Sequence, residues 1–136
     1  MPIAKILLAT FSSWFLAQVI LKVLITSLRE HRFSGKAAFQ QGGWPSSHTA
    51  LVSSLSLSVG LTQGFSSVMF VVTSVFSILV IYEALVTRNV IGSINRLINK
   101  KFKDALLSES VGHSLFEVFC GLLIGGLVVF LVFWKI

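Results

Sequence analysis

Two histidines stand near the starts of two apolar segments, and their neighbours suit phosphoryl-transfer chemistry. His113 and Glu117 are four residues apart, a spacing that puts both side chains on one face of a helix. A carboxylate that holds one ring nitrogen leaves the other nitrogen free to act as a nucleophile or base. A buried structural pair with no chemical role is the alternative interpretation.

His48 follows the stretch Trp44-Pro45-Ser46-Ser47, which is typical of the start of a helix with Pro45 at its first position. The unpaired backbone N–H groups and the positive dipole end of such a helix favour a bound phosphate. Ser46 and Ser47 add hydroxyl donors, and His48 could give a proton to a leaving oxygen. The alternative is a capped helix whose serines serve packing alone.

Three cations accompany these histidines and could bind the anionic oxygens of a phosphoryl group. Lys22 and Arg29 are seven residues apart, or two turns on one helix face, and Arg88 ends an apolar segment that also carries Glu83. Cations near the ends of spans also extend toward lipid headgroups without binding a substrate. The nearby histidines favour the phosphate-binding interpretation.

The composition places these residues in a membrane. Of the 136 residues, 54% are hydrophobic and 12% are charged, about half the charged share of a soluble domain. This excludes an ordinary soluble globule and a disordered chain. The net charge of +6 then indicates anionic lipid headgroups or a phosphorylated substrate, and not nucleic acid. A single domain over residues 1–136, with no disulfide and no metal site, is expected.

Four apolar segments follow one another along the chain. They cover about Ile6–Leu28, Pro45–Leu61, Val68–Val86 and Val111–Trp134. A span needs about 20 apolar residues, so we predict an all-α, polytopic membrane bundle of about four transmembrane helices. The first segment is long enough to span, which favours a retained helix over a cleaved signal peptide.

The connection after Arg88 carries a further helical pattern. Its apolar residues recur at helical spacing, opposite asparagine and lysine: Ile91, Ile94, Ile98 and Phe102. This pattern predicts an amphipathic interfacial helix that lies in the headgroup plane. A solvated helix packed on the protein is the alternative.

Four spans put both long basic connections on one side of the membrane. Eight Lys or Arg lie in these connections (Arg29, Arg32, Lys36, Arg88, Arg96, Lys100, Lys101 and Lys103), against two on the other side (Lys5 and Lys135). The positive-inside rule makes the connection side cytoplasmic. The ionisable residues near span ends then all fall at this edge: Lys22, His48, Glu83, His113 and Glu117. Such residues are costly to bury and mark functional sites.

Residues 42–50 (GGWPSSHTA) resemble the second signature of the type 2 phosphatidic acid phosphatase superfamily, which also includes vanadium haloperoxidases. They are most similar to the short, divergent bacterial and plant branch, which carries a GGxPSSHSA motif. The resemblance covers nearly the whole chain in order. It continues through Ala17-Gln18 with Lys22, Tyr82-Glu83-Ala84 with Arg88 and Gly92, and Gly112-His113 with Glu117-Val118.

The chain departs from the superfamily pattern at several positions. Lys22 and Arg29 match the spacing of the first signature, where Glu30 replaces a proline. His113 matches the third signature, with Glu117 in the place of an aspartate.

The third signature also has an arginine shortly before its histidine, and this chain has none there. Arg88 is the best substitute. Glu83 stands where the divergent branch has an aspartate and could orient Arg88 or Lys22, or merely be a buried partner.

The resemblance implies a metal-independent phosphatase without a cofactor. His113 would form a phosphohistidine, Glu117 would orient it, and His48 would protonate the leaving group. The phosphoryl oxygens would be held by Lys22, Arg29, Arg88 and the amides of Ser46–His48. The substrate would be a lipid phosphate: phosphatidic acid, phosphatidylglycerophosphate or a polyprenyl diphosphate. A bacterial inner membrane or a plastid membrane is the expected location.

Two other functions stay open. A catalytically degenerate membrane scaffold or lipid-binding protein would tolerate the departures from the signatures. A small transporter is disfavoured because the polar groups cluster at one edge and not at the midplane. Gly121 and Gly125 form a small-xxx-small pair that predicts helix packing within the chain or a homodimer contact.

Overall fold

The regular elements of the described chain are helices. The computed structural model describes residues 2–39, 42–102, 104 and 106–135. In order, the elements are α1 (Pro2–Phe15), η1 (Leu16–Leu21), α2 (Lys22–Glu30), η2 (Gly35–Phe39), α3 (Ser47–Gln63), α4 (Val68–Tyr82), η3 (Glu83–Thr87), α5 (Arg88–Lys101) and α6 (Leu115–Lys135). The short η1 and η3 are π-helical, and η2 is a 3₁₀ helix.

Three helices of the described chain are long and apolar enough to cross a membrane. They are Pro2–Glu30, which joins α1, η1 and α2, Val68–Lys101, which joins α4, η3 and α5, and Leu115–Trp134 within α6. The remaining helix of the expected four, α3, has 17 residues, fewer than the roughly 20 that a span needs.

The serine-rich α3 lies at the centre of the bundle and contacts α1, α4 and α6. Most of its serines form hydrogen bonds with neighbouring helices or with carbonyls of α3 itself: Ser56 Oγ lies 2.9 Å from Ser74 Oγ of α4. In the same interface, Ser77 Oγ of α4 donates to the carbonyl oxygen of Val52 at 2.9 Å. Because α3 is surrounded by helices on three sides, it needs less apolar surface than a helix that faces lipid.

Gly121 and Gly125 let α6 approach α3 closely. A Cβ atom at Gly121 would lie 2.5 Å from the carbonyl oxygen of Ser46, and one at Gly125 would overlap Ser53 Oγ. Both glycines are buried. The structure therefore has both glycines in helix packing within the chain, and a homodimer contact stays a prediction.

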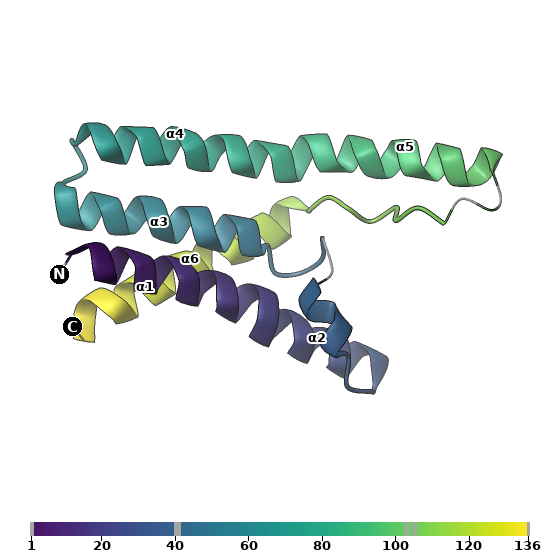
Figure 1. Ribbon diagram of the computed structural model, residues 1–136, viewed down its shortest axis with the longest axis horizontal. Coiled ribbons are helices and arrows are strands. Elements are labelled where there is room, and N and C mark those ends of the chain that lie inside the picture. The colour runs from purple at the N-terminus through teal and green to yellow at the C-terminus, as the bar shows by residue number, and fades with distance from the viewer. Residues whose placement is uncertain (1, 40–41, 103, 105, 136) are drawn as a thin grey trace.

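The amphipathic pattern after Arg88 forms a helix as expected, but that helix does not lie across the end of the bundle. In Figure 1, α5 continues the axis of α4, and the 34 residues of Val68–Lys101 make a rod about 51 Å long at 1.5 Å per residue. The hydrocarbon core is about 30 Å thick. The helix Val68–Lys101 runs on through η3 without a bend, and the placement of α5 in the headgroup plane stays a prediction.

Two helices begin later than the apolar pattern suggests. Instead of Pro45, the first helical residue of α3 is Ser47, and Ser46 is the N-cap whose hydroxyl accepts a hydrogen bond from the backbone N–H of Thr49. The helix α6 begins at Leu115, four residues after the expected start. In both cases hydrophobicity marks the apolar run, whereas a capping side chain sets the helix start.

The connections between the helices lie at the two ends of the bundle. The α2–α3 and α5–α6 connections lie at one end, and the two termini with the α3–α4 turn lie at the other, as Figure 1 shows. The sequence predicted this arrangement from helix alternation. The candidate site lies where the first connection meets the starts of α3 and α6.

Candidate active site

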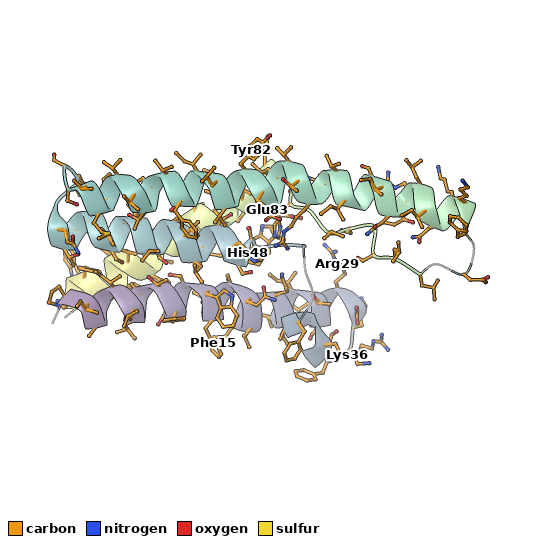
Figure 2. All side chains as sticks on the ribbon, turned by 45° about the horizontal axis from the view of Figure 1, so that its top comes forward. Phe15, Arg29, Lys36, His48, Tyr82 and Glu83 are labelled. Carbon is orange, nitrogen blue, oxygen red and sulfur yellow. The ribbon has the colours of Figure 1, made fainter. Side chains whose placement is uncertain are left out.

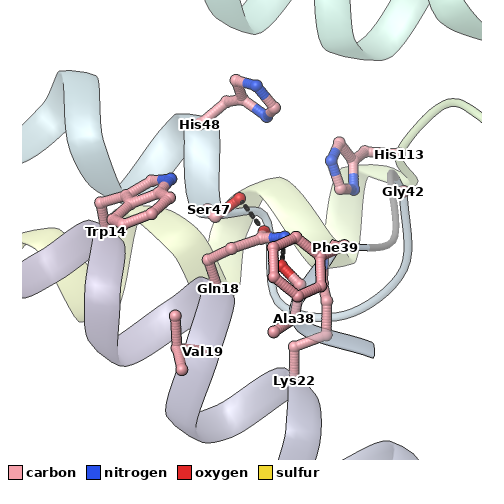
Figure 3. A pocket seen from close by; sticks show the side chains of 10 residues that line it. All are labelled: Trp14, Gln18, Val19, Lys22, Ala38, Phe39, Gly42, Ser47, His48 and His113. Carbon is pink, nitrogen blue, oxygen red and sulfur yellow. Dashed lines mark hydrogen bonds between the residues drawn. The ribbon is translucent and has the colours of Figure 1, made fainter. Parts of the chain in front are cut away.

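A cavity of about 410 Å³ opens between the first helix and the starts of α3 and α6. Both histidines of interest line it, together with Lys22 and Ser47. Figure 3 shows the rings of His48 and His113 on either side of this space. The two imidazoles therefore meet at one end of the bundle, as the sequence predicted.

Glu117 fixes the ring of His113. Its Oε2 lies 2.9 Å from His113 Nδ1, and the His113 side chain is 1% exposed. Because the carboxylate accepts from Nδ1–H, the lone pair of Nε2 is the one left for chemistry. The expected pairing at a spacing of four is present, although His113 precedes α6 instead of lying within it.

The same carboxylate also caps α6. Glu117 Oε2 accepts from the backbone N–H of Ser114 at 3.1 Å, and Ser114 Oγ accepts from the backbone N–H of Glu117 at 3.3 Å. This reciprocal pair is a capping box, whose Ser-x-x-Glu spacing was readable in the sequence and marks the true start of α6. Glu117 thus couples the start of the helix to the position of His113.

The backbone of His113 is held by the third apolar segment. Its N–H donates to the carbonyl oxygen of Ala84 at 3.1 Å, and its carbonyl oxygen accepts from Asn89 Nδ2 at 3.0 Å. Ala84 belongs to the π-helical η3, and π turns are often found at functional sites. The resemblance places Ala84 in a motif, and the structure gives its carbonyl a specific use.

His48 is the second residue of α3, and its ring reaches the cavity from that side. Its Nδ1 is buried and has no hydrogen-bond partner among the described residues. Ser46, by contrast, does not line the cavity: its buried hydroxyl lies 2.9 Å from Thr49 Oγ1. Ser46 therefore serves the start of the helix, and its hydroxyl is not placed for the phosphate contact that was expected.

Gln18 joins three parts of the site, and the sequence reasoning did not select it. Its Oε1 accepts from Ser47 Oγ at 2.6 Å and from Lys22 Nζ at 3.2 Å, and its Nε2 donates to the carbonyl oxygen of Ala38 at 2.7 Å. Gln18 lies in the π-helical η1. A polar amide that interrupts an apolar span was the available signal, and here it positions the buried ammonium of Lys22.

Gly42 brings the two motif loops together. Its φ of +73° is a conformation that glycine adopts readily. A Cβ atom there would also lie 2.8 Å from the carbonyl oxygen of Ser110, in the segment that leads to His113. The first glycine of the GGWPSSH stretch therefore packs against the loop of the second histidine.

Arg29 and Arg88 stand next to this cavity, not in its lining. Arg29 lines a neighbouring cavity of about 210 Å³, which shares Lys22 and Gly42 with the first. Figure 2 shows Arg29 pointing from α2 toward the long helix Val68–Lys101. Arg88 Nε lies 2.9 Å from both carboxylate oxygens of Glu83. Glu83 thus contacts Arg88, and its role in orienting that guanidinium stays a prediction.

The two histidines and Lys22 are arranged to bind an anion. Two imidazoles and one buried ammonium line the same cavity, near the starts of two helices whose dipoles favour negative charge. Within the described part of the chain, no three His, Cys, Asp or Glu side chains gather as metal ligands would. The polar groups that line the cavity are Gln18, Lys22, Ser47 and the two imidazoles, beside apolar side chains such as Val19 and Phe39.

Comparison with known proteins identifies the family. Residues 3–128 match the Divergent PAP2 family. The chain belongs to this family. It is also 32% identical over 139 residues to the "Uncharacterized membrane protein YuiD" of Bacillus subtilis strain 168, with 88% of this chain and 87% of that protein covered.

No solved structure matches the chain. Membership of the Divergent PAP2 family and the three candidate spans together establish an integral membrane protein.

Proposed function

We propose that this Divergent PAP2 family member is a membrane-embedded phosphatase that hydrolyses a lipid phosphomonoester or diphosphate through a phosphohistidine. The observation that carries the proposal is that His48 and His113 line one cavity with Lys22. A phosphorus atom held between the rings would have a nucleophile on one face and a proton donor on the other, which is the geometry of in-line displacement.

In the first step, the lone pair of His113 Nε2 attacks phosphorus. The new N–P bond forms as the P–O bond to the lipid breaks, and that bond's electrons go to the leaving oxygen. His48 gives this oxygen a proton. Glu117, which accepts from His113 Nδ1–H at 2.9 Å, stabilises the positive charge that grows on the ring.

In the second step, water replaces the enzyme at phosphorus. His48 takes a proton from the water as its oxygen attacks, and the N–P bond breaks to release inorganic phosphate and restore His113. Lys22 lines the cavity and would bind the phosphoryl oxygens throughout. Ser47 also lines it, and its hydroxyl, which donates to Gln18 Oε1 at 2.6 Å, would have to turn to the phosphoryl group to bind it. Arg29 would act from the adjoining cavity, and Arg88 would act with its partner Glu83.

The depth of the site supports a lipid substrate. His113 lies just before the 20-residue span Leu115–Trp134, whose length of about 30 Å equals the thickness of the hydrocarbon core. The cavity would then lie at the water–lipid boundary, where the phosphate of a membrane lipid resides. The excess of basic residues in the connections at this end favours the cytoplasmic side.

The test is phosphate release by purified protein in detergent with a chelator present. Phosphatidic acid, phosphatidylglycerophosphate and a polyprenyl diphosphate would be offered separately. We expect turnover of at least one lipid, inhibition by vanadate, and loss of turnover in His113→Ala. The matched control is His31→Asn, because His31 is exposed at the end of α2 with φ of 51° and asparagine tolerates that conformation.

Equal phosphate release by wild type and His113→Ala would overturn the assignment of the nucleophile. Absence of turnover with every lipid, while the folded protein still binds them, would favour the alternative of a catalytically degenerate lipid-binding protein or scaffold.

A further inference from the structure

A second, apolar cavity lies beside the histidine cavity on the membrane-facing surface. It has a volume of about 530 Å³ and is lined by Phe11, Trp14, Phe15, Leu16 and Ile20 of the first helix and Val128 of α6, with Ser12 as its one polar member. We call it the apolar groove. Cavities of 300–1,000 Å³ with mostly apolar linings are the usual sites for small molecules.

The apolar groove and the histidine cavity share Trp14 as a lining residue. This tryptophan is 37% exposed and lines both. The apolar groove is lined mostly by hydrocarbon side chains, whereas the histidine cavity also carries Gln18, Ser47 and the two imidazoles. A molecule that occupied both spaces would need an apolar part and a polar part joined at this position.

The three cavities follow one another along the first helix. The apolar groove is lined by residues 11–20, the histidine cavity by residues 14–22 and the cavity with Arg29 by residues 22–30 of that helix. Because a helix rises about 1.5 Å per residue, this order is also an order of depth. The lining thus changes from apolar to catalytic to cationic in the direction in which a lipid changes from tail to headgroup.

We propose that the apolar groove binds the hydrocarbon tail of the lipid whose phosphoryl group occupies the histidine cavity. This inference rests on the proposed function and extends it to a specificity site. The order of the linings selects this occupant: a free phosphate ion would leave the groove empty, and a helix from another protein would bring no anion to the histidines. Trp14 packs where the tail meets the headgroup, the position that tryptophan favours in membranes.

The first experiment fills the groove and compares two substrates. Ile20→Trp places a bulky ring in the groove, and Leu24→Trp is the matched control, because Ile20 and Leu24 are 48% and 51% exposed on the same helix and Leu24 lines neither cavity. The substrates are dioleoyl phosphatidic acid and the water-soluble dibutyryl phosphatidic acid.

We expect Ile20→Trp to lower kcat/KM for the long-tailed lipid by about 10-fold or more, the scale on which a few lost methylene contacts act. The short-tailed substrate should change less than about 2-fold, and Leu24→Trp should leave both substrates near wild type. Equal losses for the two substrates, or equal effects of the two variants, would overturn the proposal.

The second experiment needs no turnover and so separates this inference from the proposed function. The His113→Ala protein is irradiated with a phosphatidic acid that carries a diazirine at the end of one tail. We expect adducts on residues 11–20 and on Val128 that unlabelled dioleoyl phosphatidic acid displaces and dioleoyl phosphatidylcholine does not. Adducts spread over α1, α4 and α6 in proportion to exposure, or displaced equally by both lipids, would refute the groove even if the protein is an active phosphatase.

Discussion

Asn89 Nδ2 donates a hydrogen bond to the carbonyl oxygen of His113 at 3.0 Å, which ties together two residues 24 positions apart in the chain. The contact leaves no room for a side chain at Gly112, whose Cβ atom would overlap the Asn89 amide. Further along α5, Asn95 and Asn99 donate to the carbonyl oxygens of Ser108 and Leu107. One face of α5 therefore holds the extended segment that carries His113 to the cavity.

The first prediction concerns this support. Asn89→Ala removes the contact with the His113 carbonyl and should lower kcat about 10-fold or more, because a misplacement of about 1 Å can cost up to 100-fold. The loss of one such hydrogen bond should destabilise the fold by only about 1 kcal/mol. The control is Ser93→Ala, since Ser93 Oγ bonds only within its own helix, to the carbonyl of Asn89. The prediction is checked by comparing the turnover and the thermal stability of both variants in detergent.

The second prediction concerns the contact between α3 and α6. Gly125→Ala would push a methyl group into Ser53 Oγ and the carbonyl of Ala50, whereas a Cβ atom at Gly126 meets nothing within 4 Å. Overpacking of this kind costs about 1–3 kcal/mol, so Gly125→Ala should melt earlier in detergent. Gly126→Ala should match or exceed wild type, because alanine favours a helix by up to about 1 kcal/mol over glycine. Equal melting of the two variants would contradict the packing role.

The third prediction separates the two uses of the Glu117 carboxylate. Glu117→Gln keeps an oxygen that can accept from the Ser114 N–H but loses the charge beside the His113 ring. Turnover should fall by about 100-fold or more, in the range of acid–base contributions, while the melting temperature changes little. Glu117→Asp should restore part of the activity because the charge returns. If Glu117→Gln retained full turnover, the pair would be structural alone.

The fourth prediction concerns pH and the α5–α6 connection. The hydrogen bond from Asn99, followed by Arg96, lowers the pKa of Glu109 below its ordinary value of 4.5. A lowered pKa means that the contact contributes stability above about pH 4.5 and loses it as the pH falls through the folded-state value. The Leu107 amide donates to Asn99 Oδ1. The ratio of its hydrogen-exchange rate to the rates of amides in α3 should therefore rise as the pH is lowered. Glu109→Gln should remove most of that pH dependence.

The sequence predicted the convergence of the site because helix alternation and charge counting are properties of a whole segment. Apolar runs located the long helices, and the basic connections placed Lys22, His48 and His113 at one end. The spacing of His113 and Glu117 predicted their contact even though His113 lies outside α6. These inferences needed only the order of segments, and the fold preserves that order.

Other features depend on atoms that no segment pattern describes. The straight path from α4 into α5 arises in the π turn at Glu83–Thr87, and apolar spacing does not distinguish this path from a bend into the headgroup plane. The hydroxyl of Ser46 was assigned to phosphate, yet it completes the N-cap of α3. Gln18 interrupts an apolar span, which marks it in the sequence, but its partners Ser47 and Ala38 are distant in sequence, so the pattern does not reveal which groups it joins.

The unbroken rod of α4 and α5 makes the histidine site sensitive to the membrane itself. A helix longer than the local hydrocarbon layer adjusts to that layer by tilting, and here the rod also carries the asparagines that hold the His113 segment. A change in the tilt of this rod would displace α5 and, with it, the segment that carries His113. Bilayers built from shorter or longer acyl chains would thus change the spacing of the two imidazoles, and with it the rate of the proposed lipid hydrolysis.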